Sequence, residues 1–358
     1  MSSNTPARLT LIVPELLWPE PADQMAYAGL ERATAAGWLL ARSPLDHGPR
    51  RSFEAALAAA FGLDDPALAG FRRRGESAAP MPQADQRWLC ADPVHLRFHH
   101  ERIVLADAGA FALEIDEAEA MVDDLNREFA EVGEFHAATA RRWYLRLKQP
   151  VSHRSQPLSA VAGRRVDGEL PAEEAALSRW LNEVQMFLHL HPVNERRQRQ
   201  GQPAINSLWL WGDGSQQTPP QGRFDRVWCA SDSSPLAAGL AQAAGCPVGT
   251  DLPEPEQLIE HARRGERQLL VLDTLLAPVL YENSEEWNQA WHQLDRQWFA
   301  TVRTQLGKAF STVDLLAPTI FGELRWHFSG GERWKFWSGS RDLGALARQL
   351  AGPEIAAR

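Results

Sequence analysis

Four aspartates stand directly after short apolar segments that are typical of buried strands. They are Asp213, Asp232, Asp273 and Asp314. In an open α/β sheet, ligands bind beyond the carboxyl ends of the strands, so these carboxylates are candidates for one common site. Carboxylates gathered at such an edge would bind divalent cations and, beside a hydroxyl nucleophile, would support phosphoryl transfer. Each aspartate could instead cap the helix that follows its strand, which is the commoner role for a single one.

The 11 histidines supply few further candidates, because they form no HExxH motif. His327 lies on the polar face of an alternating segment, so its side chain is available. His191 lies on the apolar stripe of a helix and is expected to be buried. The chain has no GxGxxG after a strand, no P-loop motif and no GxSxG. The signatures of Rossmann dehydrogenases, P-loop NTPases and α/β-hydrolases are therefore missing.

The elements that would position these residues alternate between strand and helix. Short apolar strands are predicted at Leu9–Val13, Asn206–Trp211, Val227–Ala230, Leu269–Leu272 and Ala309–Val313, and helices at Pro235–Ala244, Pro255–Arg264 and Glu285–Leu306. This alternation predicts an α/β fold with a doubly wound, mostly parallel sheet. The run Asn206–Trp211 is apolar on both faces, which favours a central parallel strand covered by helices on each side.

A different pattern begins near residue 80. Alternation at Val94, Leu96 and Phe98, followed by the apolar Ile103–Leu105, predicts a β-hairpin. The stretch Arg72–Gln86 is expected to be a loop that marks a boundary.

The same pattern continues with a helix and a further strand. Asp116 and Glu119 have the spacing of a capping box before an amphipathic helix, and Trp143–Leu147 alternates as a strand. We therefore expect an inserted α+β subdomain with ββαβ order at residues 81–149. Residues 1–80 and 150–358 would form the discontinuous α/β domain.

Composition excludes several classes of partner. The chain has 37 Lys+Arg against 46 Asp+Glu, a net charge of −9, and no long basic tract, so nucleic acid is not expected as a partner. The apolar segment Leu9–Val13 is too short to span a membrane. Cys90, Cys229 and Cys246 show no CxxC spacing, which argues against a disulfide framework and a structural zinc site. We expect a cytoplasmic protein without a membrane partner.

Several phrases of the chain resemble archaeal-type, cofactor-independent phosphoglycerate mutases, whose catalytic domain is alkaline-phosphatase-like. They are His191–Asn194, Gly201–Asn206, Leu208–Gly214, Val132–His136, Arg142–Leu147 and Ile115–Leu125. The chain is similar above all to the RpfE-type regulatory proteins of bacteria, which are themselves mutase-like. The resemblance covers about Asp92–Gly214.

In that family a serine accepts the phosphoryl group, and two divalent metals held by Asp and His activate it. The resemblance implies that Ser52, before an Ala-rich helix, corresponds to this nucleophile, although Phe53 replaces the neighbouring aspartate. The first strand of the family ends in Asp-Gly, so one metal ligand is missing here unless Glu15 substitutes. The remaining metal ligands correspond to Asp273, Asp314 and His327. Such a site needs about half a dozen ligands, so it is expected to be incomplete.

We interpret the chain as a catalytically degenerate phosphoglycerate-mutase-like protein with a regulatory or ligand-binding role and no cofactor. A pocket for a small anionic metabolite would be lined by Arg142, Arg196, Arg197, Asn194 and Asp213. The alternative is an active phosphomutase or phosphatase that uses Ser52 and Mn²⁺ or another divalent metal on a small phosphorylated metabolite.

A third possibility is a scaffold that docks a protein partner through its tryptophans. Most of the 14 tryptophans lie at apolar periodic positions, among them Trp287, Trp291 and Trp298, and are expected to be core residues. Trp334 and Trp337 are the candidates for exposure.

Overall fold

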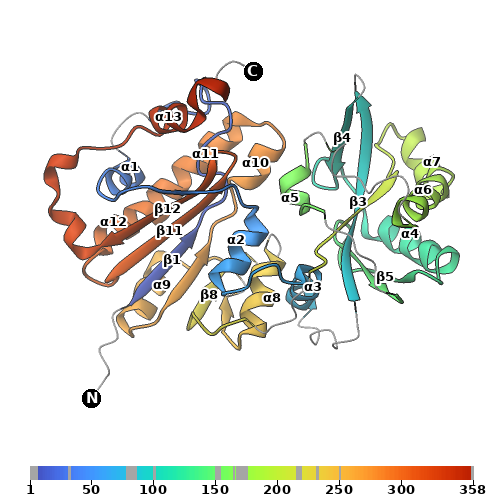
Figure 1. Ribbon diagram of the computed structural model, residues 1–358, viewed down its shortest axis with the longest axis horizontal. Helices are drawn as coiled ribbons and strands as arrows, with labels where there is room; N and C mark the ends of the chain where they lie inside the picture. The colour runs from blue at the N-terminus through green and yellow to red at the C-terminus, as the bar shows by residue number, and fades with distance from the viewer. Residues whose placement is uncertain are drawn as a thin grey trace. The chain divides into compact units, whose positions relative to one another are not determined.

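The chain folds into two compact units. The computed structural model describes residues 7–30, 34–77, 87–99, 102–149, 155–163, 166, 176–214, 220–230, 234–249 and 251–355. Unit 1 comprises Met1–Gly62 and Pro220–Arg358, and unit 2 comprises Leu63–Pro219 (Figure 1).

Unit 1 is built on a seven-stranded sheet with the order β2-β12-β11-β1-β10-β8-β9. Its strands are β1 (Arg8–Ile12), β2 (Asp46–Gly48), β8 (Arg226–Trp228), β9 (Val248–Gly249), β10 (Gln268–Val271), β11 (Thr312–Thr319) and β12 (Gly322–Ser329). All pairings from β11 through β1 and β10 to β9 are parallel, and β12 is antiparallel to both of its neighbours. The prediction of a mostly parallel sheet in an α/β fold is confirmed.

The helices of unit 1 lie between these strands in the chain or follow the last of them. They are α1 (Ala35–Leu40), α2 (Phe53–Ala60), α8 (Pro235–Ala243), α9 (Pro255–Arg263), α10 (Leu276–Leu280), α11 (Ser284–Leu294), the π-helical turn η1 (Asp295–Phe299), α12 (Ala300–Gln305), the 3₁₀ turns η2 (Gly330–Trp334) and η3 (Phe336–Ser338), and α13 (Leu343–Ile355). The single helix predicted at Glu285–Leu306 is thus a continuous run of α11, η1 and α12.

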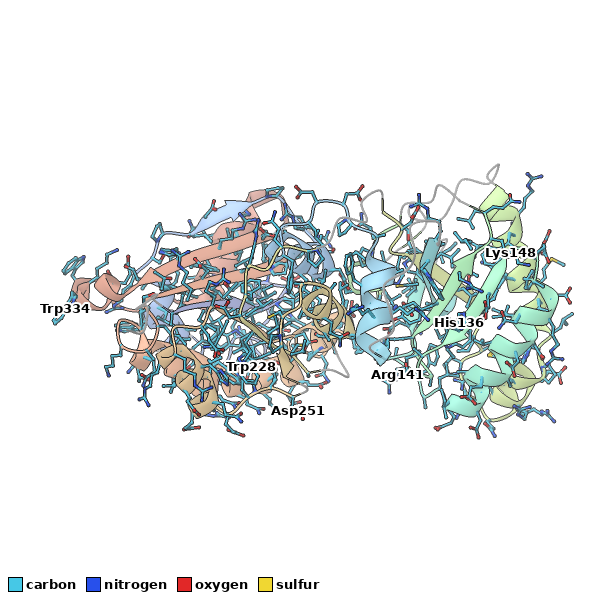
Figure 2. The ribbon with its side chains drawn as sticks, turned by 90° about the horizontal axis from the view of Figure 1, so that it is seen from below. His136, Arg141, Lys148, Trp228, Asp251 and Trp334 are labelled. Atoms are coloured by element: carbon cyan, nitrogen blue, oxygen red, sulfur yellow. The ribbon has the colours of Figure 1, made fainter. Side chains whose placement is uncertain are left out.

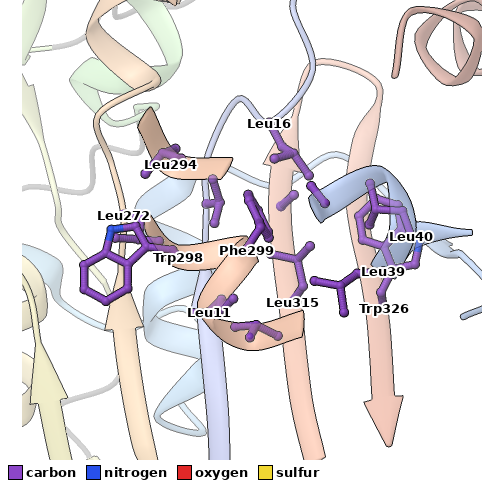
Figure 3. Close-up of a cluster of buried hydrophobic side chains, with 14 of the residues drawn as sticks. Leu11, Leu16, Leu39, Leu40, Leu272, Leu294, Trp298, Phe299, Leu315 and Trp326 are labelled. Atoms are coloured by element: carbon purple, nitrogen blue, oxygen red, sulfur yellow. The ribbon is translucent and has the colours of Figure 1, made fainter. Parts of the chain in front are cut away.

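The main core of unit 1 covers one face of the sheet. Alternate strand residues such as Leu11, Leu315 and Trp326 point into it and meet Leu39 of α1 and Phe299 of η1 (Figure 3). Because side chains alternate between the two faces of a strand, the residues between them point to the opposite face.

The tryptophan stripe of α11 and η1 belongs to this core. Trp287, Trp291 and Trp298 are all buried. The indole Nε1 of Trp287 donates to Glu15 O at 2.9 Å, and that of Trp291 donates to Leu16 O at 3.1 Å. The predicted core role of these residues is confirmed, and their indoles hold the loop that follows β1.

Unit 2 contains a second, wholly antiparallel sheet arranged around β3. Its strands are β3 (Arg87–His99), β4 (Arg102–Asp107), β5 (Gly133–Ala137), β6 (Trp143–Leu147) and β7 (Ser207–Trp211), and its helices are α3 (Leu68–Ser77), α4 (Ile115–Glu128), α5 (Leu158–Val161), α6 (Ala176–His189) and α7 (Pro192–Arg199). The strand β3 pairs with β4, β6 and β7, and β5 pairs with β6. The helices α4 and α6 bury one face of this sheet.

The strand β7 was predicted to be a central parallel strand of the main sheet, and this prediction is wrong. It runs antiparallel to β3, with Trp209 opposite Asp92. Leu208 and Leu210 pack in the core of unit 2, while Trp209 Nε1 donates to Gln156 O on the other side at 3.0 Å. Both faces are apolar because both are covered, and that pattern does not reveal the direction of the neighbouring strand.

The boundaries of the second unit also differ from the expected 81–149. Unit 2 runs from Leu63 to Pro219, because α6, α7 and β7 complete the core that β3–β6 begin. The loop predicted at Arg72–Gln86 is helical up to Ser77, and residues 78–86 lie outside the described part. The capping box of α4 is formed by Glu114 and Glu117, two residues before the predicted pair.

Candidate functional site at the carboxyl edge of the main sheet

Two carboxylates lie just beyond the carboxyl ends of the parallel strands in unit 1. Glu15 follows β1 with φ of 54° and is buried, and its amide N donates to Pro318 O at 2.9 Å. Asp273 follows β10 and accepts a hydrogen bond from the hydroxyl of Ser234, which precedes α8. This edge is where an α/β sheet places a ligand site.

Ser52, the predicted nucleophile, is the N-cap of α2. Its Oγ accepts a hydrogen bond from Ala55 N at 3.1 Å, and its φ and ψ of −68° and 161° are those of an N-cap residue. Within the described residues, no histidine or carboxylate hydrogen-bonds to Ser52 Oγ. The hydroxyl therefore satisfies one of the free amides at the start of the helix.

Asp314 and His327 contact each other, but not at this edge. Asp314 Oδ1 lies 2.7 Å from His327 Nδ1, since the two residues are paired across β11 and β12. Asp314 was predicted to follow a strand ending at Val313. The strand instead begins at Thr312 and continues past Asp314, which is level with Thr10.

Asp273 is therefore separated from that pair. Val271 is level with Ile12, so Asp273 stands about four residues further along the strands than Asp314. At roughly 3.3 Å per residue, this offset is about 13 Å, and the two strands are not adjacent. No group of three His, Cys, Asp or Glu side chains suited to a metal occurs in the described ranges. The residues present at the edge do not fit a two-metal centre.

A thiol near Asp273 does not complete the donor set either. Cys229 directly follows β8 and is buried. Burial, together with the nearby negative charge of Asp273, raises the pKa of Cys229 to about 12. The unbound thiol is therefore neutral at physiological pH, and among the described residues Cys229 and Asp273 belong to no group of three side chains suited to a metal.

Asp213 belongs to unit 2, in a glycine-rich turn. Its Oδ1 accepts from Gly214 N at 2.9 Å. A Cβ on Gly214 would lie 2.3 Å from the Pro66 carbonyl carbon, and a Cβ on Gly212 would lie 3.0 Å from Ala69 N. Close backbone packing against the start of α3 thus accounts for the Gly-Asp-Gly sequence. Asp232 lies outside the described residues.

Asn194 and Arg197, predicted to bind an anion, are buried inside unit 2. Asn194 Nδ2 donates to Leu188 O and Ile205 O, both at 2.7 Å, and its Oδ1 accepts from Ile205 N at 2.8 Å. Arg197 Nη1 donates to Glu117 Oε2 at 2.7 Å. Both side chains use their polar groups to join α7 to neighbouring segments.

The other two predicted arginines are not brought together with Arg197. Arg142 donates through Nε to Glu76 Oε1 at 2.6 Å and through Nη2 to Glu76 Oε2 at 2.9 Å. Arg196 lies on the exposed side of α7. The predicted pocket is therefore not assembled from these residues.

A buried ion pair in unit 2 was not predicted. Arg72 of α3 donates through Nη1 and Nη2 to Asp92 of β3 at 2.9–3.0 Å. Asp92 also accepts from Trp143 N at 3.2 Å and from Trp211 Nε1 at 2.8 Å. Beside this pair, burial raises the pKa of Cys90 to about 12. The aspartate within the otherwise apolar stretch Trp88–Val94 was the available signal.

Comparisons of the sequence with those of known proteins show similarity over part of the chain. No family model matches the chain. The 2,3-bisphosphoglycerate-independent phosphoglycerate mutase of Methanosarcina barkeri is 29% identical over 196 residues, which are 51% of this chain and 48% of that enzyme. A second such mutase, from Methanothermobacter thermautotrophicus, is 34% identical over 156 residues, 42% of this chain and 38% of the relative.

The chain is similar to these phosphoglycerate mutases over part of its length. The matches span about half the length of the curated relatives. The solved structure of the PH0037 protein from Pyrococcus horikoshii aligns with a TM-score of 0.59 at 13% identity, over 99% of this chain and 98% of that one. This mutase-like chain therefore shares the fold of that protein. No helix in its described residues is long and apolar enough to cross a bilayer.

Proposed function

We propose that this protein is a mutase-like scaffold that does not transfer phosphoryl groups and acts by binding a ligand or a protein partner in the cytoplasm. The observation that carries the proposal is the role of Ser52, whose Oγ accepts a hydrogen bond from Ala55 N at 3.1 Å. A regulatory role, as in the RpfE-type proteins that the sequence resembles, would follow from such binding.

The chemistry of serine supports this proposal. A serine hydroxyl is a weak nucleophile and needs an adjacent base or a metal to activate it. Among the described residues, the carboxyl edge offers Glu15 and Asp273 but no gathered group of three metal-binding side chains. Two divalent cations need about six ligands or more between them, so the donors at this edge are too few.

Enzyme assays test the proposal directly. The full chain would be incubated with Mn²⁺ and either 3-phosphoglycerate or p-nitrophenyl phosphate, alongside Ser52→Ala, Ser52→Asp and a control, Ser338→Ala, at a partly exposed serine of η3. We expect no turnover above a no-protein blank in any sample. Turnover that requires Mn²⁺, persists in Ser338→Ala and disappears in both Ser52 variants would overturn the proposal.

The stability of the same variants tests the capping role. An alanine at the N-cap of α2 removes the acceptor for Ala55 N and should lower the free energy of unfolding by about 1 kcal/mol. Aspartate is as good an N-cap as serine, so Ser52→Asp should stay within about 0.5 kcal/mol of the native chain. Equal loss in both variants would contradict this role.

The second candidate function is a metal-dependent phosphomutase or phosphatase that acts through Ser52. It is favoured by the placement of Glu15 and Asp273 at the carboxyl edge, where this fold class binds ligands. In that case Mn²⁺ or another divalent metal would be the cofactor. The Mn²⁺ assay above separates the two candidates.

A protein partner would find two exposed tryptophans on unit 1. Trp334 and Trp337 are 74% and 72% exposed, and Trp334 projects from its turn at the end of the unit (Figure 2). Tryptophan is enriched among residues that dominate binding energy at protein interfaces. These two side chains are therefore the first to replace in a search for a partner.

A further inference from the structure

A cleft of about 1030 Å³ opens on the sheet face of unit 1 that is turned away from the main core. Its floor is formed by alternate residues of three strands, including Thr10, Asp314 and His327, whose sheet neighbours Leu11, Val313 and Phe328 point into the core. Ala59 and Ala60, at the last turn of α2, form one wall. A volume near 1000 Å³ is at the upper end of the range for small-molecule sites.

The cleft is distinct from the carboxyl edge. The helix α2 begins after Ser52 at that edge and reaches the cleft at Ala60. At about 1.5 Å per residue, eight residues separate the two places by roughly 12 Å. Nothing about the cleft therefore depends on whether Ser52 is catalytic.

Positive charge gathers at the end of the cleft where β1 and β10 begin. Leu9 is paired with Gln268, so Arg8 and Arg267, one residue earlier in each strand, are neighbours across the sheet. Arg267 forms an ion pair with Asp225, with 2.7 Å between Nη2 and Oδ1. The side chain of Arg8 has no hydrogen bond or ion pair with any residue that the structure describes.

A second arginine of the cleft lining also forms no ion pair with a carboxylate among the described residues. Arg223 Nε donates to the neutral amide oxygen of Gln221 at 3.0 Å, and among described residues its guanidinium has no ion pair. Each acidic residue of the lining lies next to a residue other than these two arginines. Asp314 contacts His327 at 2.7 Å, Glu332 contacts Lys335 at 2.6 Å, and Asp46 is paired in the sheet with Arg325.

Apolar side chains complete the lining next to these charges. Leu316 lies on the floor two residues after Asp314, and Phe224 follows Arg223 and meets Phe61 edge-on, with 5.4 Å between the ring centroids. A ligand suited to this lining carries a negative group for the two arginines and an apolar body for Leu316 and Phe224. Guanidinium groups favour carboxylate and phosphate because they donate two parallel hydrogen bonds.

We propose that this cleft is a binding site for an organic anion, whose carboxylate or phosphate contacts Arg8 and Arg223 and whose apolar part packs on Leu316 and Phe224. The site rests on the proposed ligand-binding role and names the class of ligand. It lies across the face of the sheet, from Arg8 at the start of β1 to Leu316, which is level with Ile12 at the end of that strand. Its occupant is a small molecule, in keeping with the volume and with the mixture of charged and apolar lining.

Titration calorimetry of the full chain with 1-naphthoate tests the proposal, with 1-naphthalenemethanol as the neutral probe of similar shape. We expect saturable binding of the carboxylate and at least tenfold weaker binding of the alcohol. Arg8→Gln and Arg223→Gln should each weaken naphthoate binding about tenfold, which corresponds to about 1.4 kcal/mol. Ala60→Trp should abolish binding because it fills the cleft.

Control variants outside the cleft show whether a loss of binding is specific to the cleft. Arg263→Gln removes an exposed arginine of α9 that is not part of the cleft, and Ser52→Ala alters the carboxyl edge, so both should bind naphthoate as the native chain does. Arg8→Lys should recover part of the affinity lost in Arg8→Gln, and thermal unfolding should confirm that each variant is folded. Equal binding of acid and alcohol, or full affinity in Arg8→Gln and Arg223→Gln, would overturn the proposal.

Discussion

Breaking the buried Arg72–Asp92 ion pair should destabilise unit 2 strongly. Asp92 is fully buried and accepts hydrogen bonds from Arg72, Trp143 N and Trp211 Nε1. Replacement of Asp92 by alanine leaves the buried guanidinium of Arg72 without its partner. It also leaves Trp143 N and Trp211 Nε1 without an acceptor. Removing one partner of a buried pair typically costs about 3–5 kcal/mol. We expect Asp92→Ala and Arg72→Met to fall in this range.

The assay must report unit 2 alone, because the two units need not unfold together. Native-state hydrogen exchange, read by mass spectrometry on peptides from β3, β6 and β7, meets this need. A loss of about 3–5 kcal/mol corresponds to exchange that is faster by a factor of roughly 10² to 4 × 10³. Peptides from β1 and β11 of unit 1 serve as the internal reference and should keep their protection.

A double-mutant cycle isolates the interaction itself. Because the guanidinium is no longer stranded when both charges are removed, Arg72→Met/Asp92→Ala should lose less than the sum of the single losses, by about 2–3 kcal/mol. The exposed pair Arg264–Glu260 on α9 is the control, and Glu260→Gln should cost less than about 1 kcal/mol. Strictly additive losses, or a loss below about 1 kcal/mol in Asp92→Ala, would refute the reasoning.

Two further predictions concern buried groups. Burial raises the pKa of Cys90 and Cys229 from 9.0 to about 12, and that of Cys246 from 9.0 to about 11. An aromatic disulfide reagent at pH 8 should therefore label the thiols of the native chain at least tenfold more slowly than those of the urea-unfolded chain. Since these thiols ionise less readily when folded, stability should also fall as pH rises above 9. Asn194→Ala should cost about 1–3 kcal/mol in urea unfolding because it strands backbone partners, whereas the exposed Arg196→Ala should stay within about 0.5 kcal/mol. Equal effects at Asn194 and Arg196 would contradict the structural role of the asparagine.

The alternation of apolar residues predicted the faces of the strands well. Trp143, Leu145 and Leu147 point into the core of unit 2 as expected, and the stripe of Trp287, Trp291 and Trp298 is buried. These features depend only on the period of two residues in a strand and about 3.6 in a helix. Both periods involve residues that are close together in the chain, so they can be identified from the sequence alone.

The pairing and level of the strands could not be predicted in the same way. The apolar pattern of β7 indicates that both of its faces are covered. An antiparallel neighbouring strand is as compatible with that pattern as a parallel one. Asp314 was expected at the end of a strand because the residues before it are apolar, yet the strand continues to Thr319. Which residues end up side by side depends on register, and register is set by contacts that are distant in sequence.

The placement of the polar residues also limits what the family resemblance can imply. The resemblance covers about Asp92–Gly214, and within it Asp92, Asn194 and Arg197 bond to partners inside unit 2. Chemistry of the mutase type would need the carboxyl edge of unit 1, where Ser52 caps α2 and Asp273 stands apart from Asp314. Residues that are used to hold one unit together account for similarity in that unit without implying activity in the other.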